Sequence, residues 1–123
     1  MSPEKFLLVD DNTLLRASLA KLIGLWRSEA VIEEASNGKE ALEKAKTEKP
    51  AIIFLDIIMP DMDGYEACRK LAEDPATKGI PIVFVTSKGE KADKVWGQMQ
   101  GAKAYLVKPV NADQVVDQLK ALA

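Results

Sequence analysis

Short apolar runs alternate with helical patterns along the whole chain. The runs are rich in Ile, Val, Leu and Phe, and they predict strands over residues 6–9, 30–33, 51–55, 82–85 and 104–107. Several runs are almost continuously apolar, as expected of parallel strands that helices cover on both faces. The alternation therefore predicts βαβ units and an α/β fold built on a parallel sheet.

A helical pattern follows each predicted strand. The expected helices cover residues 15–26, 38–47, 65–73, 92–99 and 112–122. Ser36 or Asn37 can cap the second helix, and Asn111 with Gln114 can form a capping box at the fifth. The apolar stripes consist of Leu15, Leu19, Leu22, Ile23 and Trp26; Ala41, Leu42 and Ala45; Tyr65, Cys68, Leu71 and Ala72; Ala92, Val95, Trp96 and Met99; and Val115, Val116, Leu119 and Leu122.

The composition narrows the chemistry that this chain can perform. It has 123 residues, of which 47% are hydrophobic and 29% charged, with one cysteine and no histidine. A Ser-His-Asp or Cys-His nucleophile, an imidazole base and a mixed Cys/His zinc site are therefore excluded.

The length fits one domain over residues 1–123, and no linker or internal repeat interrupts it. Cys68 is expected to be buried, with a reactive thiol as the alternative.

Charge and hydropathy limit the classes of partner. Seventeen Lys and Arg against 19 Asp and Glu give a net charge of -2, without the basic block of a nucleic-acid binder. The apolar run at residues 6–9 follows residues 1–5 directly and is too short for a signal peptide or a membrane span. We therefore expect a cytoplasmic protein that binds neither nucleic acid nor membrane.

Polar side chains follow four of the five predicted strands. Asp10 and Asp11 follow the first, Asp56 the third, Thr86 the fourth and Lys108 the fifth. In an open α/β sheet these strand ends border one crevice. Each Asp alone could be a turn former or a helix cap, but three carboxylates in one crevice repel each other unless a cation lies among them or one of them binds a proton. Oxygen ligands without histidine favour Mg²⁺.

Other ligands of α/β crevices fit this sequence poorly. A flavin or dinucleotide site needs a glycine- or hydroxyl-rich loop after the first strand, whereas residues 10–12 read Asp-Asp-Asn and repel phosphate. Neither GxGxxG nor GxxxxGK[ST] occurs in the chain. A phosphoryl group could therefore enter the crevice only with a bridging metal.

Four motifs in a fixed order carry a family resemblance. They are LVDDN at residues 8–12, DIIMPDMDG at 56–64, Thr86-Ser87, and Lys108-Pro109 preceded by Tyr105. Together they resemble the receiver domain of two-component response regulators, the single-domain chemotaxis type included. The resemblance covers the whole chain. It implies a flavodoxin-like (βα)5 fold, doubly wound, whose five-stranded parallel sheet has the strand order 2-1-3-4-5.

The resemblance also implies a role for each residue of the crevice. Asp56 would be the phosphoacceptor, taking a phosphoryl group from a phosphohistidine on a sensor histidine kinase. Asp11 would bind Mg²⁺ directly, Asp10 through water, and the backbone carbonyl of Ile58 would complete the protein ligands, beside Asp56. Lys108 would offset the negative charge of the phosphoryl oxygens. The histidine that this chain lacks would lie on its partner.

Two further residues would form the conformational switch of such a domain. Thr86 resembles the switch hydroxyl, and Tyr105 the aromatic that then packs inward. Without the motif, a Thr that ends a strand and a Tyr within one are ordinary sheet residues. The resemblance also implies a cis peptide between Lys108 and Pro109, although most X-Pro bonds are trans.

The region from residue 88 to 102 resembles the receivers of type IV pilus and phototaxis chemosensory systems. In this stretch Trp96 either packs the fourth helix on the sheet or binds a partner. Gly97 within a helix costs about 1 kcal/mol relative to alanine, so we expect a packing or recognition reason for it.

These features favour a stand-alone response regulator that is not an enzyme. Its phosphorylation would change the surface of the fourth helix, fifth strand and fifth helix, and so control an effector such as a pilus or flagellar motor component in twitching motility or taxis. A phosphorylation-independent adaptor and a phosphate sink for a chemosensory kinase remain alternatives. A Mg²⁺-dependent phosphatase would need an Asp-x-Asp pattern that residues 10–12 lack. A monomer or a weak dimer is expected.

Overall fold

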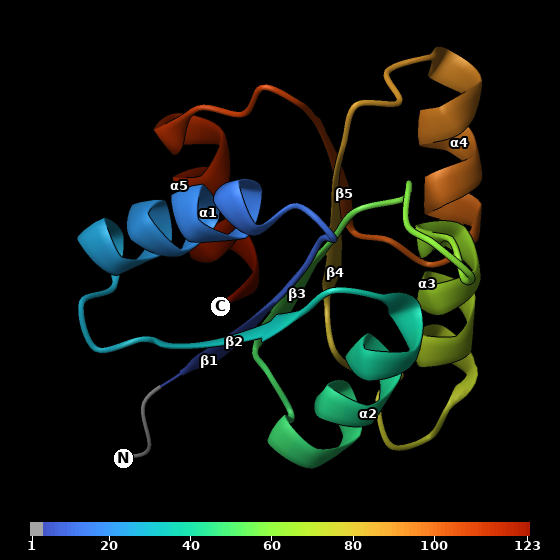
Figure 1. The fold of residues 1–123 in the computed structure, drawn as a ribbon, viewed down its shortest axis with the longest axis horizontal. Helices are drawn as coiled ribbons and strands as arrows, with labels where there is room; N and C mark the ends of the chain where they lie inside the picture. Colours follow the sequence, from blue (N-terminus) through green and yellow to red (C-terminus); the bar gives the residue numbers. More distant parts are fainter. Residues whose placement is uncertain (1–3) are drawn as a thin grey trace.

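The computed structural model describes residues 4–123 and shows a five-stranded parallel sheet with helices on both faces (Figure 1). The strands are β1 (Lys5–Val9), β2 (Val31–Ala35), β3 (Ile52–Leu55), β4 (Ile82–Thr86) and β5 (Ala104–Val107). The helices are α1 (Thr13–Trp26), α2 (Gly38–Glu48), α3 (Gly64–Glu73), α4 (Lys91–Met99) and α5 (Ala112–Leu122). The strand order β2-β1-β3-β4-β5 confirms the expected fold.

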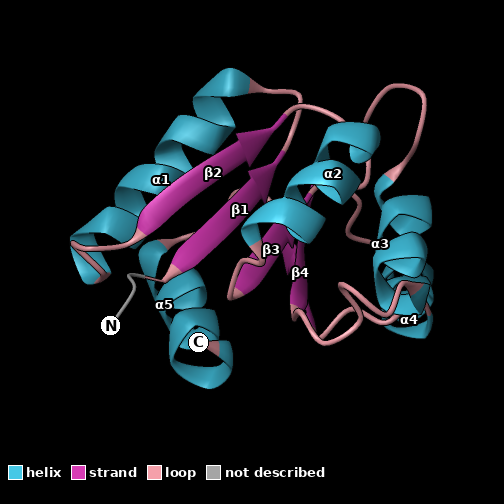
Figure 2. Ribbon diagram, turned by 90° about the horizontal axis from the view of Figure 1, so that it is seen from below, coloured by secondary structure: helices cyan, strands magenta, loops and turns pink. Residues whose placement is uncertain are grey.

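Two apolar clusters fill the space between the sheet and its helices. One contains Leu7 and Val9 of β1 with residues of α2 and α3, and the other contains Phe6 and Leu8 with residues of α1 and α5. Alternate residues of β1 therefore point to opposite faces, as the pleat of a strand requires. Figure 2 shows α1 and α5 on one side of the sheet and α2, α3 and α4 on the other.

Strand β2 differs from its predicted bounds of 30–33. The strand begins at Val31 and continues through Glu33 and Glu34 to Ala35, paired along its length with β1. A strand at the edge of the sheet tolerates charged side chains because one of its sides faces solvent. The apolar run therefore predicted too early an end for this strand, because its last residues include the charged Glu33 and Glu34.

Asparagine and aspartate side chains start most of the helices. Of the two candidate caps for α2, Asn37 is the one used, and its Oδ1 accepts a hydrogen bond from the Glu40 amide at 2.8 Å. The capping box at α5 is confirmed, with reciprocal bonds of 2.9 Å between Asn111 and Gln114. These local bonds set where each helix begins.

Two predicted apolar stripes are less buried than expected. Trp26 ends the α1 stripe but is 41% exposed, with Arg27 and Lys120 over its ring. In α4, the residues Val95, Trp96 and Met99 are 48%, 48% and 69% exposed. Gly97 is the buried residue of this helix. The stripe of α4 therefore faces outward, and packing on the sheet, one of the two expected roles of Trp96, is not what the structure shows.

Cys68 is a packing residue, as expected. Its side chain is fully buried in α3, and its Sγ lies 3.4 Å from the Gln100 carbonyl oxygen. Burial raises the pKa of the Cys68 thiol to about 12, because the thiolate loses its hydration there. The thiol is thus unreactive at neutral pH.

No helix among residues 4–123 is long and apolar enough to cross a membrane. Residues 1–3 of the N-terminal stretch considered for a signal peptide lie outside the described part of the chain.

Candidate functional site

Three carboxylates meet at the carboxyl ends of β1 and β3. One carboxylate oxygen from each of Asp10, Asp11 and Asp56 lies within 4.8 Å of the other two. They meet because Val9 pairs with Leu55 in the sheet and the Asp56 amide donates to the Val9 carbonyl at 2.9 Å. Asp10 and Asp56 are buried, whereas Asp11 is exposed. The expected acidic cluster is therefore present.

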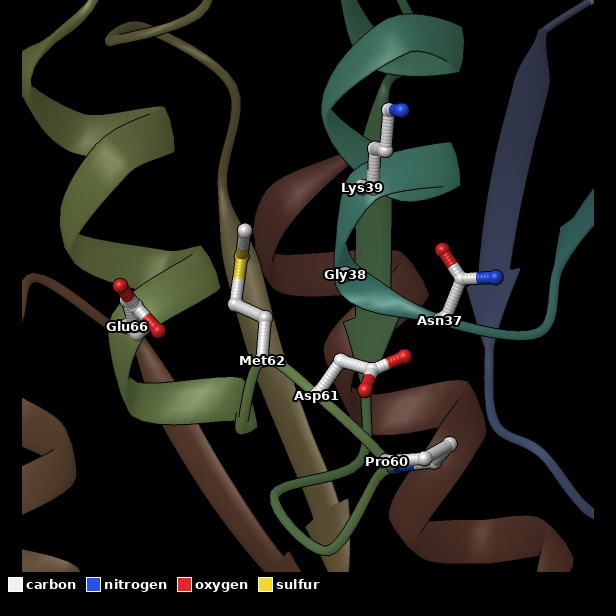
Figure 3. Close-up of a pocket in the computed structure, with 7 residues that line it drawn as sticks. All are labelled: Asn37, Gly38, Lys39, Pro60, Asp61, Met62 and Glu66. Atoms are coloured by element: carbon white, nitrogen blue, oxygen red, sulfur yellow. The ribbon is translucent and has the colours of Figure 1, made fainter.

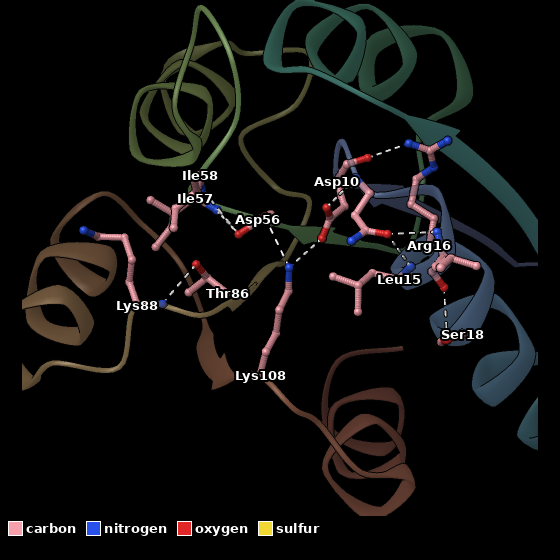
Figure 4. A network of polar contacts seen from close by, with 12 residues as sticks. Asp10, Leu15, Arg16, Ser18, Asp56, Ile57, Ile58, Thr86, Lys88 and Lys108 are labelled. Atoms are coloured by element: carbon pink, nitrogen blue, oxygen red, sulfur yellow. Dashed lines mark hydrogen bonds and ion pairs between the residues drawn. The ribbon is translucent and has the colours of Figure 1, made fainter.

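Lys108 reaches this cluster from the end of the edge strand β5 (Figure 4). Its Nζ lies 2.8 Å from Asp10 Oδ2 and 3.3 Å from Asp56 Oδ2. The lysine follows β5, which is separated from β3 by β4, so only the folded sheet brings these groups together. The peptide bond between Lys108 and Pro109 is cis, as the family resemblance implied.

The charge of the cluster fits a divalent cation. One ammonium group faces three carboxylates, which leaves an excess of negative charge in a partly buried space. The other oxygens of the buried pair accept backbone bonds, Asp10 from Asn12 at 2.8 Å and Asp56 from Ile57 at 2.7 Å. Within residues 4–123, no hydrogen bond or ion pair engages the Asp11 carboxylate, so it is free to bind a metal. Mg²⁺ prefers such oxygen ligands.

The backbone of Gly64 lies directly against the loop that follows Asp56 and holds it in place. The Gly64 amide donates to the Ile57 carbonyl at 2.8 Å, and a Cβ on Gly64 would lie 2.2 Å from the Asp56 carbonyl oxygen. Only glycine fits there. In the sequence this glycine was only the last residue of the motif at 56–64, and its contact with the loop was not foreseen. The role of the Ile58 carbonyl stays a prediction.

Arg16 supports the site and was missed by sequence reasoning. Its guanidinium donates to the Asp10 carbonyl oxygen at 2.5 Å and to Glu34 Oε1 at 3.2 Å. It thereby fixes the backbone that presents Asp10. The sequence feature that could have indicated this role is the position of Arg16 on α1, one turn after the Asn12 cap.

Thr86 and Tyr105 both contact the segment that follows β4. Thr86 is fully buried, and its Oγ1 accepts a bond from the Lys88 amide at 3.4 Å. The Tyr105 hydroxyl donates to the Lys88 carbonyl at 2.6 Å, and its ring packs against Phe84 at a centroid distance of 5.7 Å. Burial raises the pKa of the Tyr105 hydroxyl. Tyr105 therefore points inward in this structure.

A separate groove of about 410 Å³ lies between the start of α2 and the β3–α3 loop. Figure 3 shows its lining residues, which are Asn37, Gly38, Lys39, Pro60, Asp61, Met62 and Glu66. None of the three clustered carboxylates and no part of Lys108 lines it. The groove is thus distinct from the acidic site.

Comparison with known proteins places this fold and site in one family. Residues 6–120 match the family model described as the response regulator receiver domain. The chain belongs to that family, whose members are signalling proteins of two-component systems.

Several known proteins are similar to this chain along nearly its whole length, and some of them are longer than it is. Protein PilH of Pseudomonas aeruginosa is 35% identical over 96% of both chains. The chain is also 42% identical to the transcriptional regulatory protein ResD of Bacillus subtilis, but spans 47% of that longer protein. Among solved structures, the chemotaxis protein CheY4 of Vibrio cholerae matches with a TM-score of 0.87 and 30% identity, over 98% of this chain and 99% of that one.

Proposed function

We propose that this receiver accepts a phosphoryl group on Asp56 from a histidine kinase. The observation that carries the proposal is the ion pair that Lys108 makes with Asp56 beside two further carboxylates. A carboxylate oxygen of Asp56 would attack phosphorus, forming the O–P bond while the N–P bond to the kinase histidine breaks. The proton needed by the leaving imidazole comes from the kinase or from solvent.

We propose that Asp11 and Asp56 bind Mg²⁺ directly, that Asp10 binds it through water, and that the Ile58 carbonyl completes the protein ligands. When bound, the ion neutralises negative charge on the phosphoryl oxygens. The chain itself supplies the remaining charge, because Lys108 Nζ already lies 3.3 Å from Asp56 Oδ2. Since Asp56 Oδ1 is held by the Ile57 amide, the backbone orients the nucleophile before the donor arrives.

Phosphorylation would then be read at Thr86 and Tyr105. A phosphoryl group on Asp56 would attract the Thr86 hydroxyl, which now accepts a weak bond from Lys88. Because Tyr105 bonds to the same residue, movement of this segment would change the population of the inward Tyr105. The surface of α4, β5 and α5 would change with it and control an effector protein.

We place this activity in the cytoplasm and take residues 1–123 to act as one domain, as a monomer or weak dimer. The similarity to PilH over 96% of both chains supports a role in pilus-dependent motility or taxis. The output is a protein contact in this proposal, not nucleic-acid or membrane binding and not enzymatic turnover. The same site would serve a phosphate sink, whereas an adaptor independent of phosphate would not need Mg²⁺.

Intact-mass measurement after incubation with acetyl phosphate and Mg²⁺ tests this proposal. We expect one added phosphoryl group, which EDTA prevents and Asp56→Asn abolishes. Asp61→Asn, in the same loop, is the matched control and should still be phosphorylated. The proposal is wrong if the wild-type mass does not change or if Asp56→Asn gains the group equally well.

A further inference from the structure

Arg16 joins the acidic site to the edge of the sheet through two of its nitrogen atoms. Its Nη1 donates to the Asp10 carbonyl oxygen at 2.5 Å, and its Nε donates to Glu34 Oε1 at 3.2 Å. The side chain is only 15% exposed although it is charged, and Figure 4 shows it beside the backbone that follows β1. Because a guanidinium is planar and rigid, two acceptors on two of its nitrogens fix its orientation.

Glu34 lies near the end of the edge strand β2 and was not among the residues expected at the site. Its backbone is held by α2, because Lys44 Nζ donates to the Glu34 carbonyl oxygen. Lys44 is in turn 3.5 Å from the Glu40 carboxylate. Within residues 4–123, the Glu34 carboxylate has Arg16 as its only hydrogen-bond or ion-pair partner. Glu34 therefore holds the guanidinium and offsets its charge.

The contacts around Asp10 fix the backbone on both sides of Asp11. The Asp10 carbonyl and the Asp11 amide belong to one planar peptide group, so the bond from Arg16 holds both. On the other side of Asp11, the Asn12 amide donates to Asp10 Oδ1 at 2.8 Å. The exposed Asp11 carboxylate has no hydrogen bond or ion pair among the described residues. A fixed backbone thus presents a free carboxylate.

We propose that Arg16 and Glu34 are positioning residues for Mg²⁺, which set its affinity by fixing the backbone that presents the Asp11 carboxylate. The inference rests on the proposed binding of Mg²⁺ by Asp11, and it extends the site to β2 and α2. Groups that orient a metal ligand without touching the metal change its affinity by roughly 10- to 100-fold. The Glu34 carboxylate also allows a cation to lie near the metal, because it offsets the repulsion.

Charge and positioning predict opposite effects for Arg16→Gln. Removing a cation beside the site would tighten Mg²⁺ binding if charge alone mattered. Loss of both contacts should instead weaken Mg²⁺ binding about tenfold, because the peptide group between Asp10 and Asp11 is released.

Arg16→Lys gives the same test if Arg16→Gln does not fold. Lysine keeps the charge but has one nitrogen for two acceptors. We therefore expect weaker Mg²⁺ binding, whereas charge alone predicts no change.

A double substitution separates charge from positioning again. When Arg16→Gln is combined with Glu34→Gln, a cation and an anion are removed together, so charge alone predicts the wild-type affinity. Positioning predicts the affinity of Arg16→Gln, because Glu34 acts through Arg16 and the two effects are not additive.

NMR titration of the full chain with Mg²⁺ measures these affinities. In EDTA, hydrogen exchange of the Asn12 amide gives a readout without metal, and we expect it to be several-fold faster in Arg16→Gln. Arg27→Gln is the matched control, since Arg27 also binds a carboxylate, that of Glu4, and a backbone carbonyl, that of Leu119. Arg27 lies at the opposite end of α1, so its loss should leave the Mg²⁺ affinity unchanged.

Four results would overturn the inference. They are Mg²⁺ binding by Arg16→Gln as tight as in the wild type or tighter, a double variant with wild-type affinity, an equal loss of affinity in Arg27→Gln, and unchanged exchange of the Asn12 amide in Arg16→Gln. A wild-type chain that binds no Mg²⁺ would contradict the proposed function as well. The two failures are therefore distinguishable.

Discussion

At the scale of single residues, the acidic site is a balance between one ammonium group and three carboxylates. Asp10 and Asp56 are 3% and 5% exposed and share the Lys108 ammonium. Their burial weakens solvent screening, so each depends on this pairing more than a surface carboxylate would. Lys108 thus offsets part of the negative charge of this site.

Replacing Lys108 with methionine should destabilise the metal-free protein. We expect Lys108→Met to lower the free energy of unfolding in EDTA by roughly 2 kcal/mol, because two buried carboxylates lose their counter-charge. Saturating Mg²⁺ should restore part of this loss. Urea unfolding in EDTA and in Mg²⁺ measures both effects.

Lys103→Met is the control for this substitution, since Lys103 is exposed and has no ion pair among the described residues. If Lys108→Met unfolds in EDTA at the same urea concentration as Lys103→Met, the ion pairs contribute nothing to stability.

At the scale of elements, α4 packs on the sheet through its glycine. A Cβ on Gly97 would lie 3.0 Å from Tyr105 Cδ2 and 3.1 Å from Phe84 Cδ2. The missing side chain lets the helix approach the ring of Tyr105, which is part of the proposed switch, and the ring of Phe84 beside it. This contact is the packing reason expected for a glycine within a helix, and it explains why the apolar residues of α4 lie on the outer side.

Two glycine-to-alanine substitutions separate this contact from helix propensity. Gly24 lies within α1, and a Cβ added to it would meet no neighbouring element within 4 Å, so Gly24→Ala should stabilise the protein by about 0.5–1 kcal/mol. Gly97→Ala gains the same propensity but crowds Tyr105 and Phe84, so we expect a net loss of about 1 kcal/mol. Urea unfolding compares the two variants.

The Tyr105 ring signals in NMR spectra should shift in Gly97→Ala and not in Gly24→Ala. Equal stabilisation by both substitutions would contradict tight packing at Gly97.

At the scale of the whole molecule, the parallel sheet brings together side chains that are distant in sequence. Asp10 and Lys108 are 98 positions apart, yet their charged atoms lie 2.8 Å from each other. Because the site joins the ends of three strands, a ligand bound there should stabilise the complete fold.

Mg²⁺ should therefore raise the free energy of unfolding, by about 2.7 kcal/mol at a concentration 100 times its Kd. Asp11→Asn should lose this response, because the exposed carboxylate that is free to bind the ion is gone. In EDTA, Asp11→Asn should be at least as stable as the wild type, since one of three repelling carboxylates has been removed. Thermal unfolding with and without Mg²⁺ measures both.

Asp61→Asn, outside the cluster, should keep the full response to Mg²⁺. Equal stabilisation of Asp11→Asn by Mg²⁺ would exclude Asp11 as a ligand.

The fold was predictable because its signals are local. Alternating apolar runs and caps such as Asn37 and Asn111 indicated each element to within a few residues, and the four motifs indicated the strand order. The bounds of β2 were less predictable, since an edge strand does not need a continuous apolar run. The exposed stripe of α4 was also unpredictable, because periodicity shows that a helix has an apolar face but not whether another element covers it.

The sequence by itself determined the elements, the family and the residues that gather at the strand ends, since these depend on local pattern and on strand connectivity. Only the tertiary structure decided the distances from Lys108 to Asp10 and Asp56, the support that Arg16 gives to Asp10, and the close approach at Gly64. It also decided that Trp96 rests on Tyr65 with half its surface open. Some of these contacts join residues far apart in the chain and others join neighbouring elements, but the geometry of all of them depends on how whole elements pack.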